Sequence, residues 1–383
     1  MDWEIHGETT TGFEKVREAF KANWQGYEVG ACCCVVYKGK KVVDLWGGYQ
    51  DRACTKPWEE DTLVNVYSTT KGMGSLALAI LAEEGKLDYE ALVTDYWPEF
   101  GAEGKHMITV GQLLSHQAGV CGVDEKITIE DLYDWDKMVR LLAAQKPLWE
   151  PGKQSGYHAV TWGYLAGELI RRITGKTLGR YFHEKVAGPL EVDFYIGLPD
   201  SEMNRVADMI GANRARVAPK PLDGPREMPP FYTITLQNPE IRPFKDVCSY
   251  AWRKAEIPAA NGQANARAIA KIYGALANGG EIDGIRIISR KGIDTATSEE
   301  VKGEQIDLVM GKVRRFARGF VLNTEGQYGP NPQAFGHTGA GGSVGFADPE
   351  INIALGYAMN QMQVNEDDVP RAELLVKATY DCL

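Results

Sequence analysis

Apolar residues recur along this chain with two spacings, three to four residues in some segments and two in others. Near the N-terminus, four apolar side chains spaced to share one face predict a helix: Phe13, Val16, Phe20 and Trp24. Residues 29–37 and 41–46 are two mainly apolar segments with Gly39 between them, which predicts a β-hairpin. The chain is therefore expected to begin with a helix followed by two paired strands.

The middle of the sequence has helical periodicity, and strand-like patterns return toward the C-terminus. Helices are predicted at about residues 68–84, 110–114, 133–144, 162–174 and 264–276. Gly175 and the pair Gly279-Gly280 stand where helix ends favour residues that tolerate positive φ. Strands are predicted at residues 316–322, 344–347 and 352–358, and a closing helix at 371–380. Strands at both ends of the chain indicate one sheet formed from both termini, with a helical lobe inserted between them.

Prolines are concentrated in residues 217–243, at Pro219, Pro221, Pro225, Pro229, Pro230, Pro239 and Pro243. Because proline disrupts helix interiors and central strands, this segment is predicted to be irregular. Long irregular segments in compact proteins can be pocket walls or simple connections, and the sequence leaves both possibilities open.

Composition and charge argue against two classes of binding partner, nucleic acids and membranes. The 383 residues have a formal net charge of -10, and an acidic surface repels phosphate backbones, so nucleic acid is not an expected partner. The longest strongly apolar run, residues 76–82, is far too short to cross a bilayer, so no membrane association is expected. The first ten residues, MDWEIHGETT, have neither the basic start nor the apolar stretch of a secretion signal, which predicts a cytoplasmic location.

The seven cysteines do not form a recognisable metal-binding pattern. Cys32, Cys33 and Cys34 are adjacent in a predicted strand, where successive side chains point to opposite faces and cannot join in one four-ligand cage. There is no Cys-x-x-Cys pair and no His-Glu-x-x-His sequence. The cysteines are interpreted as reduced, small apolar core residues, and no metal ion or other cofactor is predicted.

Candidate chemistry begins with VNVYSTTKGMG at residues 64–74, where an extended stretch becomes a helix. Ser68 and Lys71 are three residues apart and lie on the same helix face. A serine hydroxyl needs a nearby base to act as a nucleophile, and a lysine amine can be that base when its pKa is lowered by burial or by another cation. A lone Ser-x-x-Lys pattern is common by chance, so its weight depends on what accompanies it.

Two further segments accompany it. Tyr157 stands just before the predicted helix at 162–174, where a phenol can face a pocket and act as an acid or base if cations lower its pKa. The segment GHTGAGG at residues 336–342 predicts a glycine-rich strand edge, at which free backbone N–H groups can bind an oxyanion. The two segments add to the weight of the Ser-x-x-Lys pattern.

The sequence resembles the serine β-lactamase and penicillin-binding-protein superfamily, and within it most closely the class C β-lactamases and the family VIII carboxylesterases. The motifs that support the resemblance extend over nearly the whole chain: YSTTKG at 67–72, LLSHQAG at 113–119, WEPG at 149–152, GYHAVTWGYLAGE at 156–168, TGKTLGRYFHEKVAGPL at 174–190, ANARAIAKIYGALANGG at 264–280 and GHTGAGGSVGFADPE at 336–350.

The resemblance implies an α/β fold in which an antiparallel sheet is flanked by the terminal helices and a mostly helical lobe is inserted. Residues 1–66 and 281–383 would form the sheet domain and residues 67–280 the helical domain. It also implies roles for individual residues. Ser68 would be the nucleophile and Lys71 and Tyr157 its proton-transfer partners, with the acylation base left open between those two. The N–H groups of Ser68 and Ala340 would form the oxyanion hole, and the substrate-binding strand would contribute His337, Thr338 and Gly339.

Two departures from the lactamase pattern favour an ester substrate. The Asn of the lactamase Tyr-x-Asn motif is Ala159 here, and the Lys that begins the third lactamase motif is His337. Both changes remove polar groups that would hold a β-lactam, since histidine is mostly neutral at pH 7. The expected function is hydrolysis of small, short-chain esters through an acyl-enzyme. The alternatives are a β-lactamase, a D-amino-acid peptidase or an acyltransferase with the same residues, and a non-catalytic penicillin-binding-like scaffold.

Other serine and histidine patterns are interpreted as structural. Residues 341–345 match the Gly-x-Ser-x-Gly motif of α/β-hydrolases, but no histidine follows Ser343, as that fold requires. His116 is expected to be a buried, hydrogen-bonded histidine. His158 is expected to have a structural or supporting role beside Tyr157.

Overall fold

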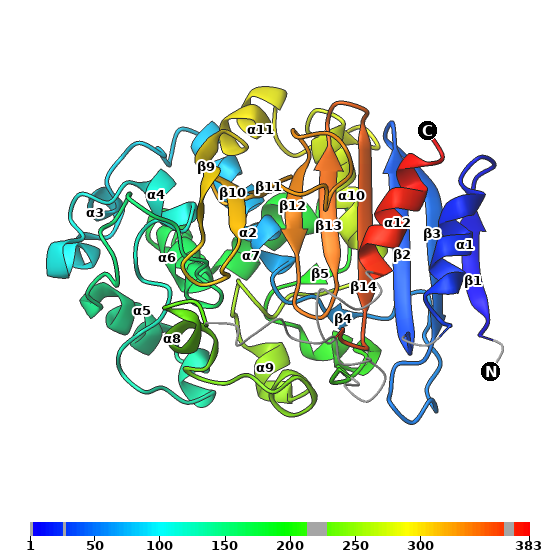
Figure 1. The fold of residues 1–383 in the computed structure, drawn as a ribbon, viewed down its shortest axis with the longest axis horizontal. Helices are drawn as coiled ribbons and strands as arrows, with labels where there is room; N and C mark the ends of the chain where they lie inside the picture. Colours follow the sequence, from blue (N-terminus) through cyan, green and yellow to red (C-terminus); the bar gives the residue numbers. More distant parts are fainter. Residues whose placement is uncertain (1–2, 26–27, 213–227, 364–370) are drawn as a thin grey trace.

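The computed structural model describes residues 3–25, 28–212, 228–363 and 371–383. Within these residues nine strands form one antiparallel sheet in the order β1-β3-β2-β14-β13-β12-β11-β10-β9 (Figure 1). Their bounds in that order are Ile5–Thr9, Lys40–Gly48, Gly30–Tyr37, Ile353–Met359, Val344–Asp348, Phe335–Thr338, Val321–Leu322, Val313–Ala317 and Glu299–Ile306. The N-terminal hairpin β2–β3 joins the C-terminal strands through the β2–β14 pair, where Cys34 lies opposite Gly356. The sheet is thus formed from both ends of the chain, as the sequence predicts.

Helices cover both faces of the sheet. The helices α1 (Glu14–Ala22) and α12 (Arg371–Tyr380) pack on one face, and α10 (Ala266–Ala277) packs on the other (Figure 1). Cys33 belongs to the apolar cluster under α1 and α12, whereas Cys32 and Cys34 belong to the cluster under α10. This arrangement confirms the prediction that adjacent cysteines point to opposite faces.

The strands under α10 contain glycine where the helix approaches most closely. A Cβ atom at Gly345 would lie 2.4 Å from Ile269 Cγ2, and one at Gly356 would lie 2.4 Å from the Ala266 carbonyl oxygen. Any larger residue at these positions would push the helix away from the sheet.

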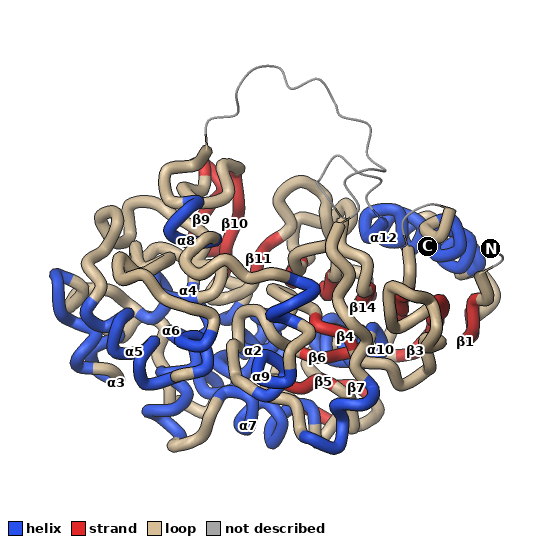
Figure 2. Tube along the Cα trace, turned by 90° about the horizontal axis from the view of Figure 1, so that it is seen from below, coloured by secondary structure: helices blue, strands red, loops and turns tan. Residues whose placement is uncertain are grey.

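A mostly helical region lies beside the sheet (Figure 2). Its α-helices are α2 (Thr70–Glu83), α3 (Val93–Tyr96), α4 (Val110–Leu114), α5 (Trp135–Ala144), α6 (Thr161–Thr174), α7 (Leu178–Phe182), α8 (Tyr232–Leu236) and α9 (Tyr250–Lys254). Short helical turns occur at η1 (Pro98–Gly104), η2 (Glu130–Tyr133), η3 (His183–Ala187), η4 (Asp200–Arg205) and η6 (Pro243–Val247). A small sheet is formed by β4 (Val64–Asn65), β6 (Gln263–Ala264) and β5 (Phe194–Tyr195), and the hairpin β7 (Glu281–Ile282) to β8 (Ile285–Arg286) leads into α11 (Arg290–Ala296).

Helix α2 is the central helix of the molecule. Every residue from Thr70 to Leu81 is buried, and the helix contacts α6, α7, α11 and β12. An apolar sequence such as LALAILA has no polar face to present to water, which is why this helix lies in the interior. It therefore places its first turn, which includes Lys71, between the sheet and the helical region.

The structure confirms the predicted helices to within about two residues at most ends. Left-handed φ angles occur at Gly175 (+70°), Gly279 (+76°) and Gly280 (+92°), as expected for residues that end helices.

One predicted strand was wrong, and two strands of the large sheet were missed. The segment 316–322 is not one strand, because Arg318 and Gly319 form a turn between β10 and β11. Strands β1 and β9 were not predicted. Both are edge strands, and β9 has the charged sequence EEVKGEQI, which gives little apolar alternation.

The proline-rich segment is also more regular than predicted. Helix α8 lies between Pro230 and Pro239, and the turn η6 begins at Pro243, so the prolines flank the helical turns and do not interrupt them. Pro219, Pro221 and Pro225 lie outside the described residues.

The division of the chain into two domains stays a prediction. Helix α10, although within the range 67–280, packs on the large sheet.

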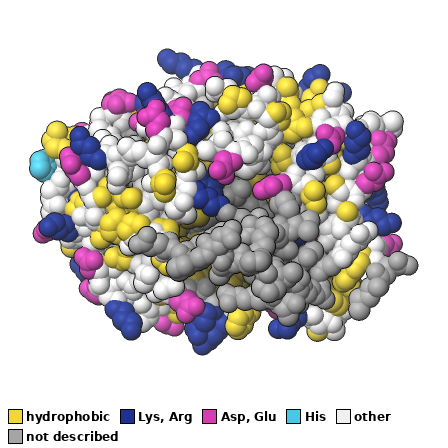
Figure 3. Space-filling model, viewed as in Figure 1, with side chains coloured by type: hydrophobic (Ala, Val, Ile, Leu, Met, Phe, Trp, Pro, Cys, Tyr) yellow, Lys and Arg dark blue, Asp and Glu magenta, His cyan; other side chains and the backbone are white. Residues whose placement is uncertain are grey.

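On the face drawn in Figure 3, acidic and basic side chains are interspersed. None of the helices in the described residues is long and apolar enough to span a membrane.

Candidate active site

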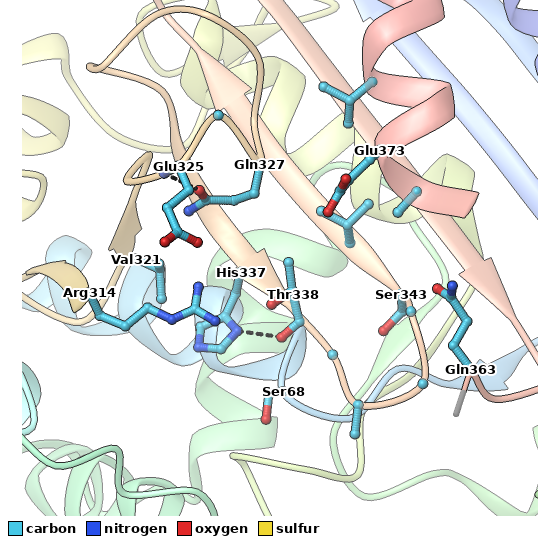
Figure 4. A pocket seen from close by; sticks show the side chains of 18 of the residues that line it. Ser68, Arg314, Val321, Glu325, Gln327, His337, Thr338, Ser343, Gln363 and Glu373 are labelled. Carbon is cyan, nitrogen blue, oxygen red and sulfur yellow. Dashed lines mark hydrogen bonds between the residues drawn. The ribbon is translucent and has the colours of Figure 1, made fainter. Parts of the chain in front are cut away.

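Ser68 lies in the turn between β4 and α2, and the backbone before it is strained. Tyr67 has a φ of +44°, a left-handed conformation that a bulky residue rarely adopts. Its geometry is fixed by neighbours, since Thr70 Oγ1 donates to the Tyr67 carbonyl and accepts from the Gly262 N–H at 2.9 Å. Strain of this kind persists only where the surrounding structure determines it, and here it directs the Ser68 side chain into the pocket (Figure 4).

Lys71 is fully buried one turn after Ser68. Its Nζ lies 3.1 Å from Ser68 Oγ and donates to the carbonyl oxygens of Ala159 at 2.7 Å and Ala259 at 3.0 Å. No carboxylate within the described residues forms an ion pair with it. Burial therefore lowers the pKa of the Lys71 ammonium well below its usual value. A lowered pKa favours the neutral amine, which is the form of lysine that can accept a proton.

Tyr157 faces the same serine from the loop before α6. Its ring lies 4.7 Å from Lys71 Nζ, and its Oη lies 3.5 Å from His337 Nε2. Burial raises the pKa of Tyr157, although contacts with Ser68 and the charge of Arg314 act in the opposite direction. A raised pKa favours the protonated phenol, which is the form of tyrosine that can donate a proton.

The end of strand β12 and the residue after it place His337, Thr338 and Gly339 along the pocket. His337 Nδ1 lies 2.7 Å from the Thr338 carbonyl oxygen (Figure 4). Burial, Lys71 and Arg314 lower the pKa of His337 to about 3, so the ring is neutral at pH 7. This residue therefore does not supply a permanent cation.

Backbone N–H groups near Ser68 are available to an oxyanion. Within the described residues, neither the Ser68 N–H nor the Ala340 N–H has a hydrogen-bond partner. The turn that contains Ala340 approaches the Ser68 loop closely, and a Cβ at Gly339 would lie 2.3 Å from the Val66 carbonyl oxygen. Glycine at this position is required for the approach.

Ser343 has a structural role, as the sequence analysis expected. It is buried, and its Oγ donates to the Val66 carbonyl at 2.8 Å and lies 3.1 Å from Thr69 Oγ1. The side chain thus ties the turn after β12 to the Ser68 loop.

The two buried histidines near Tyr157 are also hydrogen-bonded, as expected. His116 Nδ1 accepts from the His158 N–H at 3.0 Å, and His158 Nε2 accepts from the Val120 N–H at 3.1 Å. Burial lowers the pKa of both rings. They fix the backbone around Tyr157 and do not reach Ser68 in any recorded contact.

Asp307 supports Tyr157 and was not found from the sequence. Its Oδ1 accepts N–H groups from Tyr157 at 3.0 Å, Val309 at 2.9 Å and Met310 at 2.8 Å. Asp307 is 1% exposed, so these bonds form away from water. One carboxylate oxygen therefore joins the loop between β9 and β10 to the segment that holds the phenol. No local motif marks this residue.

The pocket in front of Ser68 has a volume of about 1220 Å³. Its walls come from β10, β12, the loop at residues 325–330, and α12. Leu236 of α8 also lines it, so part of the proline-rich segment is a pocket wall. In the part of the chain that is described, no cluster of three His, Cys, Asp or Glu side chains is arranged to hold a metal ion.

Comparison with known proteins shows the family to which this chain belongs. Residues 16–380 match the family described as Beta-lactamase. The chain belongs to the Beta-lactamase family. A crystal structure of a family VIII carboxylesterase is similar to this Beta-lactamase family member, with 50% identity, a TM-score of 0.92, and coverage of 99% of this chain and 100% of the other.

Two further relatives of this Beta-lactamase family member have esterase names. Esterase/beta-lactamase LipL of Mycobacterium tuberculosis is 39% identical over 374 residues, which cover 94% of this chain and 83% of the relative. The structure of EstA from Arthrobacter nitroguajacolicus is 34% identical, with a TM-score of 0.84 over 100% of this chain and 98% of the other. The resemblance and the fold class inferred from the sequence are confirmed.

Proposed function

We propose that this protein is a carboxylesterase that hydrolyses small esters through an acyl-enzyme on Ser68. The observation that supports this most directly is the buried Lys71 amine, 3.1 Å from Ser68 Oγ and without a carboxylate partner among the described residues. The esterase names of similar proteins agree with it. A neutral amine beside a serine hydroxyl is the arrangement that nucleophilic catalysis needs.

Acylation would proceed in two steps. Lys71 accepts the hydroxyl proton while Ser68 Oγ bonds to the ester carbonyl carbon, and the N–H groups of Ser68 and Ala340 bind the oxyanion. The intermediate then collapses, the bond between the carbonyl carbon and the alkoxy oxygen breaks, and Tyr157 donates a proton to the departing alkoxide. Lys71 returns the first proton to Tyr157, so the acyl-enzyme forms with no net change in protons.

Deacylation would reverse these roles with water as the nucleophile. A water molecule adds to the acyl carbon and gives up a proton to the Lys71–Tyr157 pair, and the same two N–H groups bind the second oxyanion. The bond to Ser68 Oγ then breaks, the serine recovers its proton, and the carboxylic acid leaves. No metal ion or other cofactor is needed for this balance.

The pocket lacks two groups that would favour a β-lactam. Ala159 has no amide side chain, and its carbonyl oxygen is engaged with Lys71. His337 is neutral at pH 7, since its pKa is lowered to about 3. We therefore rank an ester above a β-lactam, a D-amino-acid peptide or an acyl acceptor other than water. The intact set of Ser68, Lys71 and Tyr157 argues against a non-catalytic scaffold.

The test is hydrolysis of p-nitrophenyl acetate, butyrate and octanoate beside nitrocefin, with wild type and Ser68→Ala. Ester turnover that is lost in Ser68→Ala, with slow nitrocefin turnover, is expected. Nitrocefin turnover as fast as that of the esters would favour the β-lactamase. Ester turnover that survives Ser68→Ala would refute the mechanism. A small-molecule ester is the partner we propose, and the cytoplasmic location stays a prediction.

A further inference from the structure

The pocket contains an arginine that the proposed mechanism does not use. Arg314 extends from β10 beside His337 toward the space in front of Ser68 (Figure 4). Its neighbour on the strand, Arg315, points elsewhere and is bonded to Glu299 at 2.7 Å. Within the described residues, Arg314 has neither an ion pair nor a hydrogen bond. An arginine that lines a substrate pocket without a partner is free to bind an anion.

Two other charged residues that line the pocket differ from Arg314 or lie apart from it. Lys377 of α12 is also a cation, but it forms an ion pair with Asp381 and is therefore less available to a substrate. Glu325 also lines the pocket and lies on the Arg314 side in Figure 4, but the two side chains do not come within ion-pairing distance. Arg314 is thus a permanent cation of this pocket, placed on β10 and not at the β12 position of His337.

The position of Arg314 indicates which half of an ester it would contact. Arg314 lies beside His337 in Figure 4, and His337 Nε2 lies 3.5 Å from Tyr157 Oη, so Arg314 is on the side of the phenol that would donate to the departing alkoxide. The oxyanion N–H of Ala340 is in the turn that follows β12, beyond Thr338 and Gly339 along the strand. An anion held by Arg314 would consequently belong to the alcohol half of the substrate.

We propose that Arg314 is a specificity-determining residue that binds a carboxylate on the alcohol half of the ester, so that the preferred substrates are O-acyl esters of hydroxy acids. This inference rests on the proposed function and names its substrate class. The guanidinium offers paired donors that match a carboxylate in plane, which a neutral imidazole at position 337 does not.

The test compares two substrates that differ only in the carboxylate, 4-acetoxybenzoate and methyl 4-acetoxybenzoate. The ratio of their kcat/KM values is measured in wild type, Arg314→Gln, Arg314→Lys and Arg315→Gln. Intrinsic reactivity cancels when this ratio is compared between variants. We expect Arg314→Gln to lower the ratio about 10-fold or more, chiefly through KM of the acid. Arg314→Lys should lower it less, and Arg315→Gln, which removes the same charge outside the pocket, should not change it.

A second pair places the carboxylate on the acyl half: 4-methylphenyl hydrogen succinate and 4-methylphenyl butyrate. If Arg314→Gln lowers the ratio for this pair and not for the first, the assignment to the alcohol half is wrong. An unchanged ratio for both pairs, or an equal change in Arg315→Gln, would overturn the proposal. Inhibition of wild type by 4-hydroxybenzoate and its methyl ester provides a measurement that needs no variant, and equal inhibition constants would also count against it. Failure of the proposed function differs from all of these, because methyl 4-acetoxybenzoate would then not be hydrolysed in a Ser68-dependent way.

Discussion

Two buried cations show how the same degree of burial serves different purposes. Lys71, beside Ser68, contacts carbonyl oxygens and a hydroxyl but no carboxylate of the described chain. Arg371, at the start of α12, is equally buried but forms an ion pair with Glu28, which also accepts from Tyr357 Oη. The unpaired cation loses its charge readily and is suited to proton transfer. The paired cation keeps its charge and attaches a helix to the sheet.

The comparison implies that Lys71 contributes to catalysis at the expense of stability. In Lys71→Met, kcat for p-nitrophenyl butyrate is expected to fall about 10²- to 10⁴-fold, because the base for Ser68 is lost. The folded protein should be at least as stable as wild type at neutral pH, because a buried amine without a charged partner has been removed. Enzyme assays and thermal unfolding of the same preparations measure both effects.

The lowered pKa of Lys71 also predicts the direction in which stability changes with pH. Lys71 has a lower pKa in the folded state than in the unfolded state, so between those two values the unfolded chain binds more protons. Wild type should therefore gain stability relative to Lys71→Met as pH rises toward about 10, where the unfolded lysine also loses its proton. Likewise, kcat/KM should rise with pH through the lowered pKa of Lys71. A stability difference that is constant with pH would show that Lys71 is not desolvated as the structure indicates.

The paired cation predicts the opposite pattern. Glu28→Gln removes the carboxylate of a buried ion pair with Arg371 and is expected to destabilise the protein by about 3–5 kcal/mol. The rate per folded molecule should stay near that of wild type, because Glu28 lies under α12 and not in the pocket. Urea unfolding with parallel activity measurements tests this.

A double variant separates the ion pair from the packing around it. Glu28→Met combined with Arg371→Met removes both charges, so much of the lost stability should return. If the double variant were less stable than Glu28→Gln, the cluster would depend on contacts other than the charge pair.

The sequence predicted the fold where apolar periodicity is strong and failed where it is weak. Helix α4 was predicted at its observed bounds, and the strands β13 and β14 to within one residue. Strand β9 was missed because its charged residues are partly exposed at a sheet edge. The turn between β10 and β11 depends on pairing with distant strands, which no local pattern records.

The residues of the candidate site also fall into two groups, those that the sequence indicated and those that it did not. Ser68, Lys71 and Tyr157 were found because each stands in a short motif, and the structure brings the three together. Asp307 and Arg314 were not found, since they lie more than 100 residues away from those motifs in the chain and reach the pocket only through the pairing of β9 and β10. Short motifs mark the residues proposed to react, whereas Asp307 and Arg314, which are proposed to position a group or select the substrate, depend on the tertiary fold.

The smallest predicted effect concerns Asp307. It tests whether a residue that no motif marks contributes to the rate by holding Tyr157 in place. Asp307→Ala removes the acceptor for three buried N–H groups and should allow Tyr157 to move, which is expected to lower kcat about 10-fold. Asp307→Asn keeps an accepting oxygen at the same place and should recover most of the rate. KM should change little in either variant, because the side chain is buried and does not contact the pocket. Equal losses of kcat in the Ala and Asn variants would mean that the charge of Asp307, and not its hydrogen bond to Tyr157, is what matters. A loss that appeared only in thermal stability, with kcat unchanged, would assign Asp307 to the fold alone.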